Sequence, residues 1–170
     1  MKLLVPDPAA LRRVAGWLAD GANARWLDFG NGVHTLTLPA LTLMTKRPGH
    51  VLRIFTADDT DEAAGLVAFS DIAHDVGTAT LWYVLGAREH AGRGLTTRAV
   101  SWLLATGFAE LGLVAVSAWA VEGNVGSVRV LERNGFRLVG RQRRCHVMDG
   151  RRYDRLLYDL LAGEQGDHRA

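Results

Sequence analysis

The stretch Leu81-Trp-Tyr-Val-Leu-Gly-Ala-Arg-Glu-His-Ala-Gly-Arg-Gly-Leu-Thr-Thr-Arg-Ala99 decides how this chain folds. It begins as an apolar, aromatic-rich strand, passes through a loop with Gly92 and Gly94, and enters an amphipathic helix near Leu95. The two glycines remove side chains where backbone N–H groups converge. The first helical turn adds unpaired N–H groups and the positive end of the helix dipole. A loop of this kind predicts a socket for a diphosphate.

A second stretch, Val121-Glu-Gly-Asn-Val-Gly-Ser-Val-Arg-Val-Leu-Glu-Arg-Asn-Gly-Phe136, follows the first by about 30 residues. A buried strand over 114–121 leads to Asn124, and a short helix is expected over 127–134. Gly135 stands where a left-handed residue caps the end of a helix. The two stretches are therefore each a strand followed by a helix, with a polar or glycine-rich turn between them.

Together the two stretches resemble the GNAT superfamily of acyl-CoA-dependent N-acyltransferases. The first corresponds to that family's pyrophosphate loop, usually written Gln/Arg-x-x-Gly-x-Gly/Ala, and the second corresponds to Asn-x-x-Ser followed by Glu-Arg/Lys-x-Gly-Phe. The serine after the asparagine, with the tail Gly150-Arg-Arg-Tyr-Asp-Arg155, resembles the branch that includes ribosomal-protein N-terminal acetyltransferases. The resemblance covers residues 51–161.

Three positions depart from the family pattern. Ala91 stands at the Gln/Arg position of the loop, and Thr96 stands at its final Gly/Ala position. The family often uses a tyrosine as general acid seven residues after the asparagine, and Leu131 occupies that position. A tyrosine acid at this position is therefore excluded, whereas a loop that binds through main-chain N–H groups tolerates Ala91.

Composition predicts one domain over residues 1–163, with a polar tail over 164–170. The hydrophobic content of 48% allows a sizeable core, and the net charge of +2 gives no general reason to expect nucleic acid. No run of about 18 apolar residues indicates a membrane span. Pro6 and Asp7 break the first segment too early for a secretory signal, and a lone Cys145 forms no internal disulfide. These features favour a cytoplasmic protein.

Hydrophobic periodicity and turn residues predict the elements. Asp7 and Pro8 read as the cap and first turn of a helix that runs to Leu18. Further helices are expected over 38–45, 95–111 and 127–134, and strands over 50–57, 65–71, 78–85, 114–121, 136–144 and 152–160. Short spacers make most strand pairs antiparallel. The fold class is α/β (α+β): a mixed, mostly antiparallel sheet with helices on both faces. The resemblance implies one splayed parallel strand pair, 78–85 with 113–121.

The resemblance implies acetyl-CoA as co-substrate and no metal. The diphosphate is expected on the loop residues Ala91, Gly92, Arg93, Gly94, Leu95 and Thr96. The pantetheine arm is expected between the splayed strands, near Val84, Leu85 and Gly86, with Asn124 holding it. A bulge at Gly86 would open the strand edge, and a freed N–H between Val84 and Gly86 would serve as the oxyanion donor.

The catalytic side chains are predicted to be Glu122, as general base, and Ser127, as proton donor to the departing sulfur. His34, Asp71 and His74 are alternative bases, and water itself is a further alternative. Cys145 and His146 are neighbours on one strand, so they point to opposite faces and are expected to be structural or to line the acceptor pocket.

The acceptor is left open between a protein or peptide N-terminus and a small amine, bound under a lid formed by residues 17–44. Transfer is expected to be direct, without an acyl-enzyme. Nine arginines between 129 and 155 suit an anionic ligand such as coenzyme A. The chain is expected to be a monomer or homodimer. A non-catalytic acyl-CoA-binding module is the alternative, and nucleic-acid binding is improbable because exposed aromatic residues do not alternate with the arginines.

Overall fold

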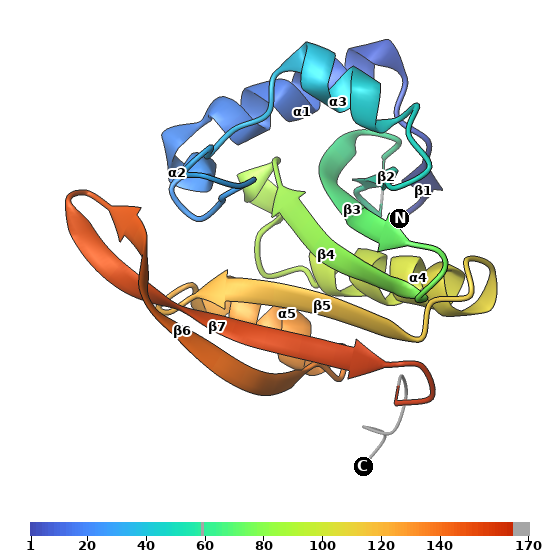
Figure 1. The fold of residues 1–170 in the computed structure, drawn as a ribbon. Coiled ribbons are helices and arrows are strands. Elements are labelled where there is room, and N and C mark those ends of the chain that lie inside the picture. The colour runs from blue at the N-terminus through green and yellow to red at the C-terminus, as the bar shows by residue number, and fades with distance from the viewer. Residues whose placement is uncertain (59, 165–170) are drawn as a thin grey trace.

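The computed structural model describes residues 1–58 and 60–164, whose strands form one seven-stranded sheet (Figure 1). The strand order is β1-β2-β3-β4-β5-β7-β6. The strands are β1 (Leu3–Leu4), β2 (Val51–Thr56), β3 (Ala63–Ala73), β4 (Thr78–Leu85), β5 (Ala115–Val121), β6 (Arg137–Met148) and β7 (Arg151–Leu161). The helices are α1 (Pro8–Ala19), α2 (Gly21–Ala24), α3 (Leu38–Met44), α4 (Leu95–Ala109) and α5 (Val125–Arg133), with a short 3-10 turn η1 (Arg88–His90).

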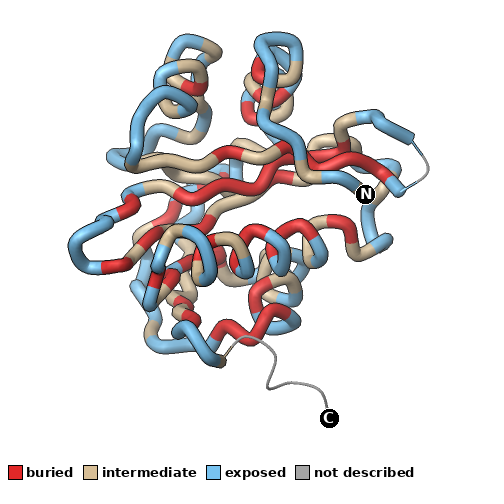
Figure 2. Tube along the Cα trace, turned by 90° about the vertical axis from the view of Figure 1, so that its right-hand side faces the viewer, coloured by how far each residue is buried: buried red, intermediate tan, exposed pale blue. Residues whose placement is uncertain are grey.

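Helices cover both faces of the sheet. Leu18 of α1 and Leu41 of α3 pack with Leu66 and neighbouring residues on one face, and Leu104 of α4 packs with Phe69 and its neighbours on the other. Successive residues of β3 and β4 alternate between these two cores, as β geometry requires. Figure 2 shows the buried residues concentrated in the strands between the two helical layers. The predicted fold class is confirmed.

The helix starts follow the predicted capping signals. The Asp7 side chain accepts a hydrogen bond from the Ala10 amide and Pro8 occupies the first turn of α1. Helix α5 begins at Val125, two residues earlier than predicted, because Asn124 is its N-cap. Gly135 has φ +85°, as expected for a residue that ends a helix in the left-handed region.

Three short elements were not predicted, namely η1, β1 and α2. Strand β1 pairs Leu3 with Phe55 at the edge of the sheet. Helix α2 forms within the expected connection 20–32, because the Asp20 side chain accepts from the Ala22 amide and caps a single turn.

Two predicted boundaries also differ from the structure. Strand β6 extends four residues beyond its predicted end, to Met148. The tail was predicted to begin at 164, but Glu164 lies 2.9 Å from Arg137 in an ion pair. Residues 165–170 lie outside the described part.

The parallel pair in the middle of the sheet is short. Strands β4 and β5 pair only over Thr78–Thr80 and Ala115–Ser117. Beyond Thr80 the two strands have no register partners in each other, although β4 continues to Leu85 and β5 to Val121. The predicted splay is therefore present, and it exposes backbone groups of β4 along one edge.

Candidate active site

A cleft of about 1440 Å³ follows the opening between β4 and β5. One end is lined by the loop before α4 and by α5, and the other end by α2, α3 and the segment between them. Among the residues predicted to bind the co-substrate, those that line the cleft are Val84, Leu85, Ala91, Gly92, Gly94, Leu95, Thr96, Asn124 and Ser127. The structure therefore brings most of the predicted set together around one cavity.

The loop end of the cleft is a cradle of backbone amides. Gly92 has φ +79° and Gly94 φ +73°, and an added Cβ at either would meet no atom within 4 Å. Glycine is needed here because L side chains rarely adopt this backbone conformation, and the space beside it belongs to the cleft. Gly94 is the N-cap of α4, and Arg98 is the first residue of the helix whose amide reaches a helical carbonyl, that of Gly94. The amides of residues 95–97 therefore have no helical partner.

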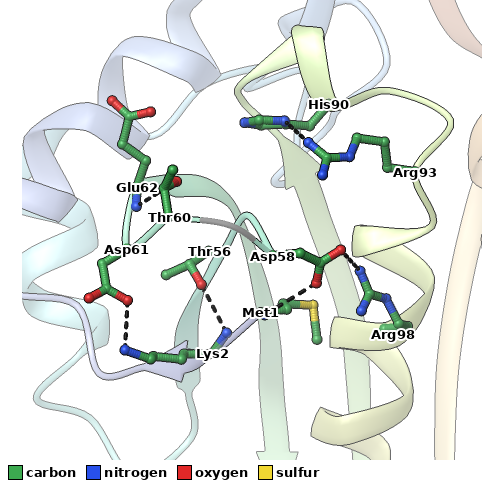
Figure 3. Close-up of polar contacts among 10 residues, drawn as sticks. All are labelled: Met1, Lys2, Thr56, Asp58, Thr60, Asp61, Glu62, His90, Arg93 and Arg98. Carbon is green, nitrogen blue, oxygen red and sulfur yellow. Dashed lines mark hydrogen bonds and ion pairs between the residues drawn. The ribbon is translucent and has the colours of Figure 1, made fainter.

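Two arginines beside this loop are held by other side chains (Figure 3). The Arg93 guanidinium lies 3.0 Å from His90 Nδ1, and Arg93 does not line the cleft. Arg98 donates to Asp58 Oδ2 at 2.6 Å, and this hydrogen bond lowers the pKa of Asp58 to about 2. Positive charge reaches the cleft from α5 instead, through Arg129 and Arg133. The Arg93 amide also donates to the His90 carbonyl at 3.3 Å, so contact between Arg93 and the diphosphate remains a prediction without support from this geometry.

The end of β4 carries the predicted bulge. The amides of Gly86 and Ala87 both donate to the Ala64 carbonyl at 2.9 Å, so two residues stand opposite one. The Gly86 amide is therefore already hydrogen-bonded, so within the predicted window 84–86 it is not the oxyanion donor. Hydrogen-bonding positions alternate along an antiparallel pair, so the backbone groups of Leu85 face the β5 side. Leu85 is the residue within 84–86 whose N–H faces the opening.

A packing contact that the sequence did not reveal explains why residue 86 is glycine. A Cβ at Gly86 would lie 1.8 Å from Cδ2 of the Trp17 indole, so α1 packs directly on the β4 backbone. Gly86 itself does not line the cleft. Trp17 thus fixes the end of β4 from the side opposite α4 and α5.

Helix α5 presents Asn124 and Ser127 to the cleft. Asn124 Oδ1 accepts from the Ser127 amide at 3.2 Å, so this oxygen serves as the helix cap and the amide nitrogen is the group left for a ligand. Tyr83 Oη lies 2.7 Å from Ser127 Oγ and donates to the Ser127 carbonyl at 3.0 Å. Burial raises the pKa of Tyr83 well above its ordinary value. Sequence reasoning missed this tyrosine because the two residues are 44 positions apart, and no local pattern links them.

The predicted base Glu122 does not face the cleft. One carboxylate oxygen accepts from Arg141 at 3.1 Å and the other accepts from the Asp154 amide at 3.1 Å. The side chain therefore links the end of β5 to the β6–β7 hairpin, and Glu122 is not among the cleft-lining residues. We do not retain it as the general base, because both of its oxygens are engaged away from the reacting centre.

The alternative bases are scattered. His74 binds the Pro48 carbonyl from the β3–β4 turn, and Asp71 lines the cleft with a left-handed φ of +53°. His34 Nδ1 lies 2.5 Å from the Leu27 carbonyl, and its ring meets the His146 ring edge-on at 5.7 Å. Within residues 1–58 and 60–164, none of the three side chains makes a hydrogen bond to Ser127.

Asp28 and Arg155 form a partly buried ion pair near the acceptor end of the cleft. Arg155 Nη2 lies 2.5 Å from Asp28 Oδ2, and its guanidinium lies over the Trp119 ring at 4.2 Å. Burial alone would raise the pKa of Asp28, but the hydrogen bonds from Arg155 and the Gly30 amide outweigh it and the pKa lies below its usual value. Asp28 and Trp119 line the cleft.

His146 lies behind this pair and is 1% exposed. Its Nε2 is 2.7 Å from the Arg25 carbonyl, which only accepts, and Arg155 Nη2 is 3.3 Å from its Nδ1. The ring is therefore neutral with its proton on Nε2. Burial lowers the pKa of His146 from its ordinary value. Of the two roles expected for His146, the structural one holds, because its hydrogen bond to Arg25 links the end of α2 to the β6–β7 hairpin.

Comparison with known proteins places the chain in a family. The model of the acetyltransferase (GNAT) domain matches residues 2–137. A probable N-acetyltransferase of Bacillus subtilis is 39% identical over 98 residues, which are 57% of this chain and 53% of the relative. The matched segments span 53–59% of the length of the curated relatives.

Solved structures agree with this fold. Spermidine N-acetyltransferase from Vibrio cholerae, in complex with CoA and spermine, superposes with a TM-score of 0.80 at 18% identity, covering 94% of each chain. An α-N-acetyltransferase of a ribosomal protein, in complex with coenzyme A, has a TM-score of 0.78 at 17% identity and covers 94% of this chain and 92% of that one.

The fold and the cleft together define an acetyltransferase-type α/β protein with an opened parallel strand pair. This chain belongs to the GNAT acetyltransferase family. Within the described part of the chain, no helix has the length and apolar character needed to cross a membrane.

Proposed function

We propose that this protein transfers an acetyl group from acetyl-CoA to a primary amine by direct attack, without an acyl-enzyme. The observation that carries the proposal is the group of amides of residues 95–97 at the start of α4, which lies on the same cleft as the unpaired edge of β4 and Ser127. Backbone amides at a helix N-terminus bind phosphate oxygens, and an unpaired strand edge binds an extended amide chain. The cleft thus offers both kinds of group that the diphosphate and the pantetheine arm of acetyl-CoA require.

The chemistry follows from the groups between these ends. The Leu85 N–H polarises the thioester carbonyl and stabilises the oxyanion that forms as the amine attacks. The new C–N bond forms first, and the C–S bond then breaks to release thiolate. The Ser127 hydroxyl donates a hydrogen bond to this sulfur. The cationic amine loses one proton before it attacks and a second after the C–N bond has formed, and the thiolate takes up one proton. With Glu122 engaged elsewhere, the amine proton leaves through water in the cleft.

The acceptor end favours an amine with a single positive charge. Acidic cleft residues in the described part of the chain are Asp28, Asp71 and Asp159, and Arg155 already neutralises the first. The surrounding surface is aromatic, with Trp26, Phe29, Trp82 and Trp119. A peptide N-terminus or a monoamine with an apolar body suits this surface better than a polyamine, whose several cations need several free carboxylates.

Calorimetric titration with acetyl-CoA tests the binding part of the proposal. Gly94→Asp should weaken binding at least about tenfold, because its carboxylate would stand where the diphosphate lies. Gly112→Asp is the matched control, since Gly112 has φ +65° with equally open space but does not line the cleft. Both aspartates adopt this conformation at similar cost, so only the binding should differ. Equal affinities in the two variants would place the diphosphate elsewhere.

A non-catalytic acyl-CoA-binding module is the second candidate. The engagement of Glu122 favours it because, among residues 1–58 and 60–164, no other carboxylate makes a hydrogen bond to Ser127. It predicts tight acetyl-CoA binding with no acetylated product from any amine. Amine-dependent release of free CoA by the wild type would exclude it.

A further inference from the structure

Tyr83 and Ser127 make a side-chain contact inside the cleft at the point where β4 and β5 have separated. Tyr83 lies on β4 and Ser127 lies on α5, and both line the cleft. Tyr83 Oη is 3.0 Å from the Ser127 carbonyl oxygen and 2.7 Å from Ser127 Oγ. One phenol therefore contacts both the backbone carbonyl and the side-chain hydroxyl of Ser127, the residue that faces the departing sulfur in the proposed reaction.

The directions of the two hydrogen bonds follow from counting protons. A carbonyl oxygen only accepts, and a phenol has a single proton. Tyr83 therefore donates to the Ser127 carbonyl and accepts from the Ser127 hydroxyl. In this arrangement the Ser127 proton points at Tyr83 and not into the cleft. Ser127 must turn its O–H toward the sulfur before it can stabilise the thiolate.

Tyr83 can follow this turn without leaving its place. Its own O–H has a second acceptor, Ser127 Oγ, which becomes free when the serine proton rotates away. Burial raises the pKa of Tyr83, which keeps the phenol protonated at ordinary pH. The tyrosine is thus a hydrogen-bond donor throughout and gives up no proton.

We propose that Tyr83 is a positioning residue for Ser127: its O–H moves from the Ser127 carbonyl to Ser127 Oγ when the serine turns its proton toward the thiolate. This inference rests on the proposed acetyl transfer. The hydrogen bond from the Tyr83 O–H fixes the position of Ser127 Oγ and polarises the Ser127 O–H bond. The hydrogen bond from Ser127 to the sulfur therefore strengthens as negative charge develops on the sulfur.

The experiment measures kcat and the acetyl-CoA Kd of the full chain with the amine that the wild type acetylates fastest. Tyr83→Phe should lower kcat about tenfold and leave the Kd within about threefold, as expected for a contact used mainly in the transition state. In a Ser127→Ala background the same substitution should change kcat by less than about twofold, because its partner is gone. In a Ser127→Thr background, which keeps the hydroxyl, the tenfold sensitivity should return.

Tyr153→Phe is the control, because Tyr153 lies on β7 outside the cleft lining. It should leave kcat unchanged. Wild-type turnover together with an unchanged kcat in Tyr83→Phe would overturn the positioning role alone. An equal loss in the wild-type and Ser127→Ala backgrounds would also overturn it, since Tyr83 would then act through the backbone of α5. A wild type without turnover on any amine would instead refute the proposed function.

Discussion

Replacing Gly86 by alanine should destabilise the protein through a clash with a single side chain. The added Cβ would lie 1.8 Å from Cδ2 and 2.1 Å from Cε2 of Trp17, so the indole must retreat by about 1.6 Å to reach ordinary contact at 3.4 Å. Overpacking of this kind costs about 1–3 kcal/mol, and a rigid indole against backbone belongs at the upper end. For a chain of this length, about 3 kcal/mol lowers Tm by about 6–12 °C.

Gly16→Ala is the matched control for this measurement. Gly16 is exposed in the interior of α1, one residue from Trp17, and a Cβ there meets nothing within 4 Å. Alanine should stabilise the helix by about 0.5–1 kcal/mol. Thermal unfolding then compares four variants: Gly86→Ala, Gly16→Ala, Trp17→Ala and the double variant Trp17→Ala/Gly86→Ala. In the Trp17→Ala background the cost of Gly86→Ala should fall below about 1 kcal/mol. A Gly86→Ala protein as stable as wild type, or an undiminished cost without Trp17, would refute the packing account.

Two further predictions concern the charged groups. Glu122→Gln should keep kcat within about twofold and leave the pH profile of kcat unchanged, because one carboxylate oxygen accepts from Arg141 and the other from the Asp154 amide. A loss of about 10²-fold or more in kcat would instead identify Glu122 as the general base. The neutral, buried His146 should make the protein less stable in acid: its folded pKa is lowered, so its contribution is present above about pH 6.5 and is lost as the pH falls through the folded pKa. Thermal unfolding between pH 8 and 5 should show a smaller decline of Tm in His146→Gln than in the wild type, and parallel curves would contradict this.

The features that the sequence predicted are those set by local chemistry. The capped start of α1 at Asp7, the glycine loop before α4 and the left-handed Gly135 after α5 each depend on residues within a few positions. The splayed strand pair came from the family resemblance, and the register of β4 with β5 confirms it. Local patterns of this kind identified the loop end of the cleft almost completely.

The features that the sequence missed depend on contacts between distant positions. Asp28 and Arg155 are 127 residues apart, and Tyr83 meets Ser127 across 44 residues. No periodicity or motif spacing links such pairs. Glu122 was chosen because it follows β5, but its orientation is decided by Arg141 on another strand. The acid–base side chains were therefore the least predictable part of the site, because tertiary packing determines which way each one points.

The acetyl-transfer reaction itself gives the most direct test of the central claim. The wild-type protein is mixed with acetyl-CoA and a panel of peptides with free N-termini, monoamines and spermidine. Free CoA and acetylated amine are then quantified by chromatography, with the intact mass of the protein followed in the same samples. We predict equal amounts of CoA and acetylated product from a peptide or monoamine, with no protein species heavier by one acetyl group. Bound acetyl-CoA without product from any amine, or an acetylated protein that forms before the product, would contradict direct transfer in this cleft.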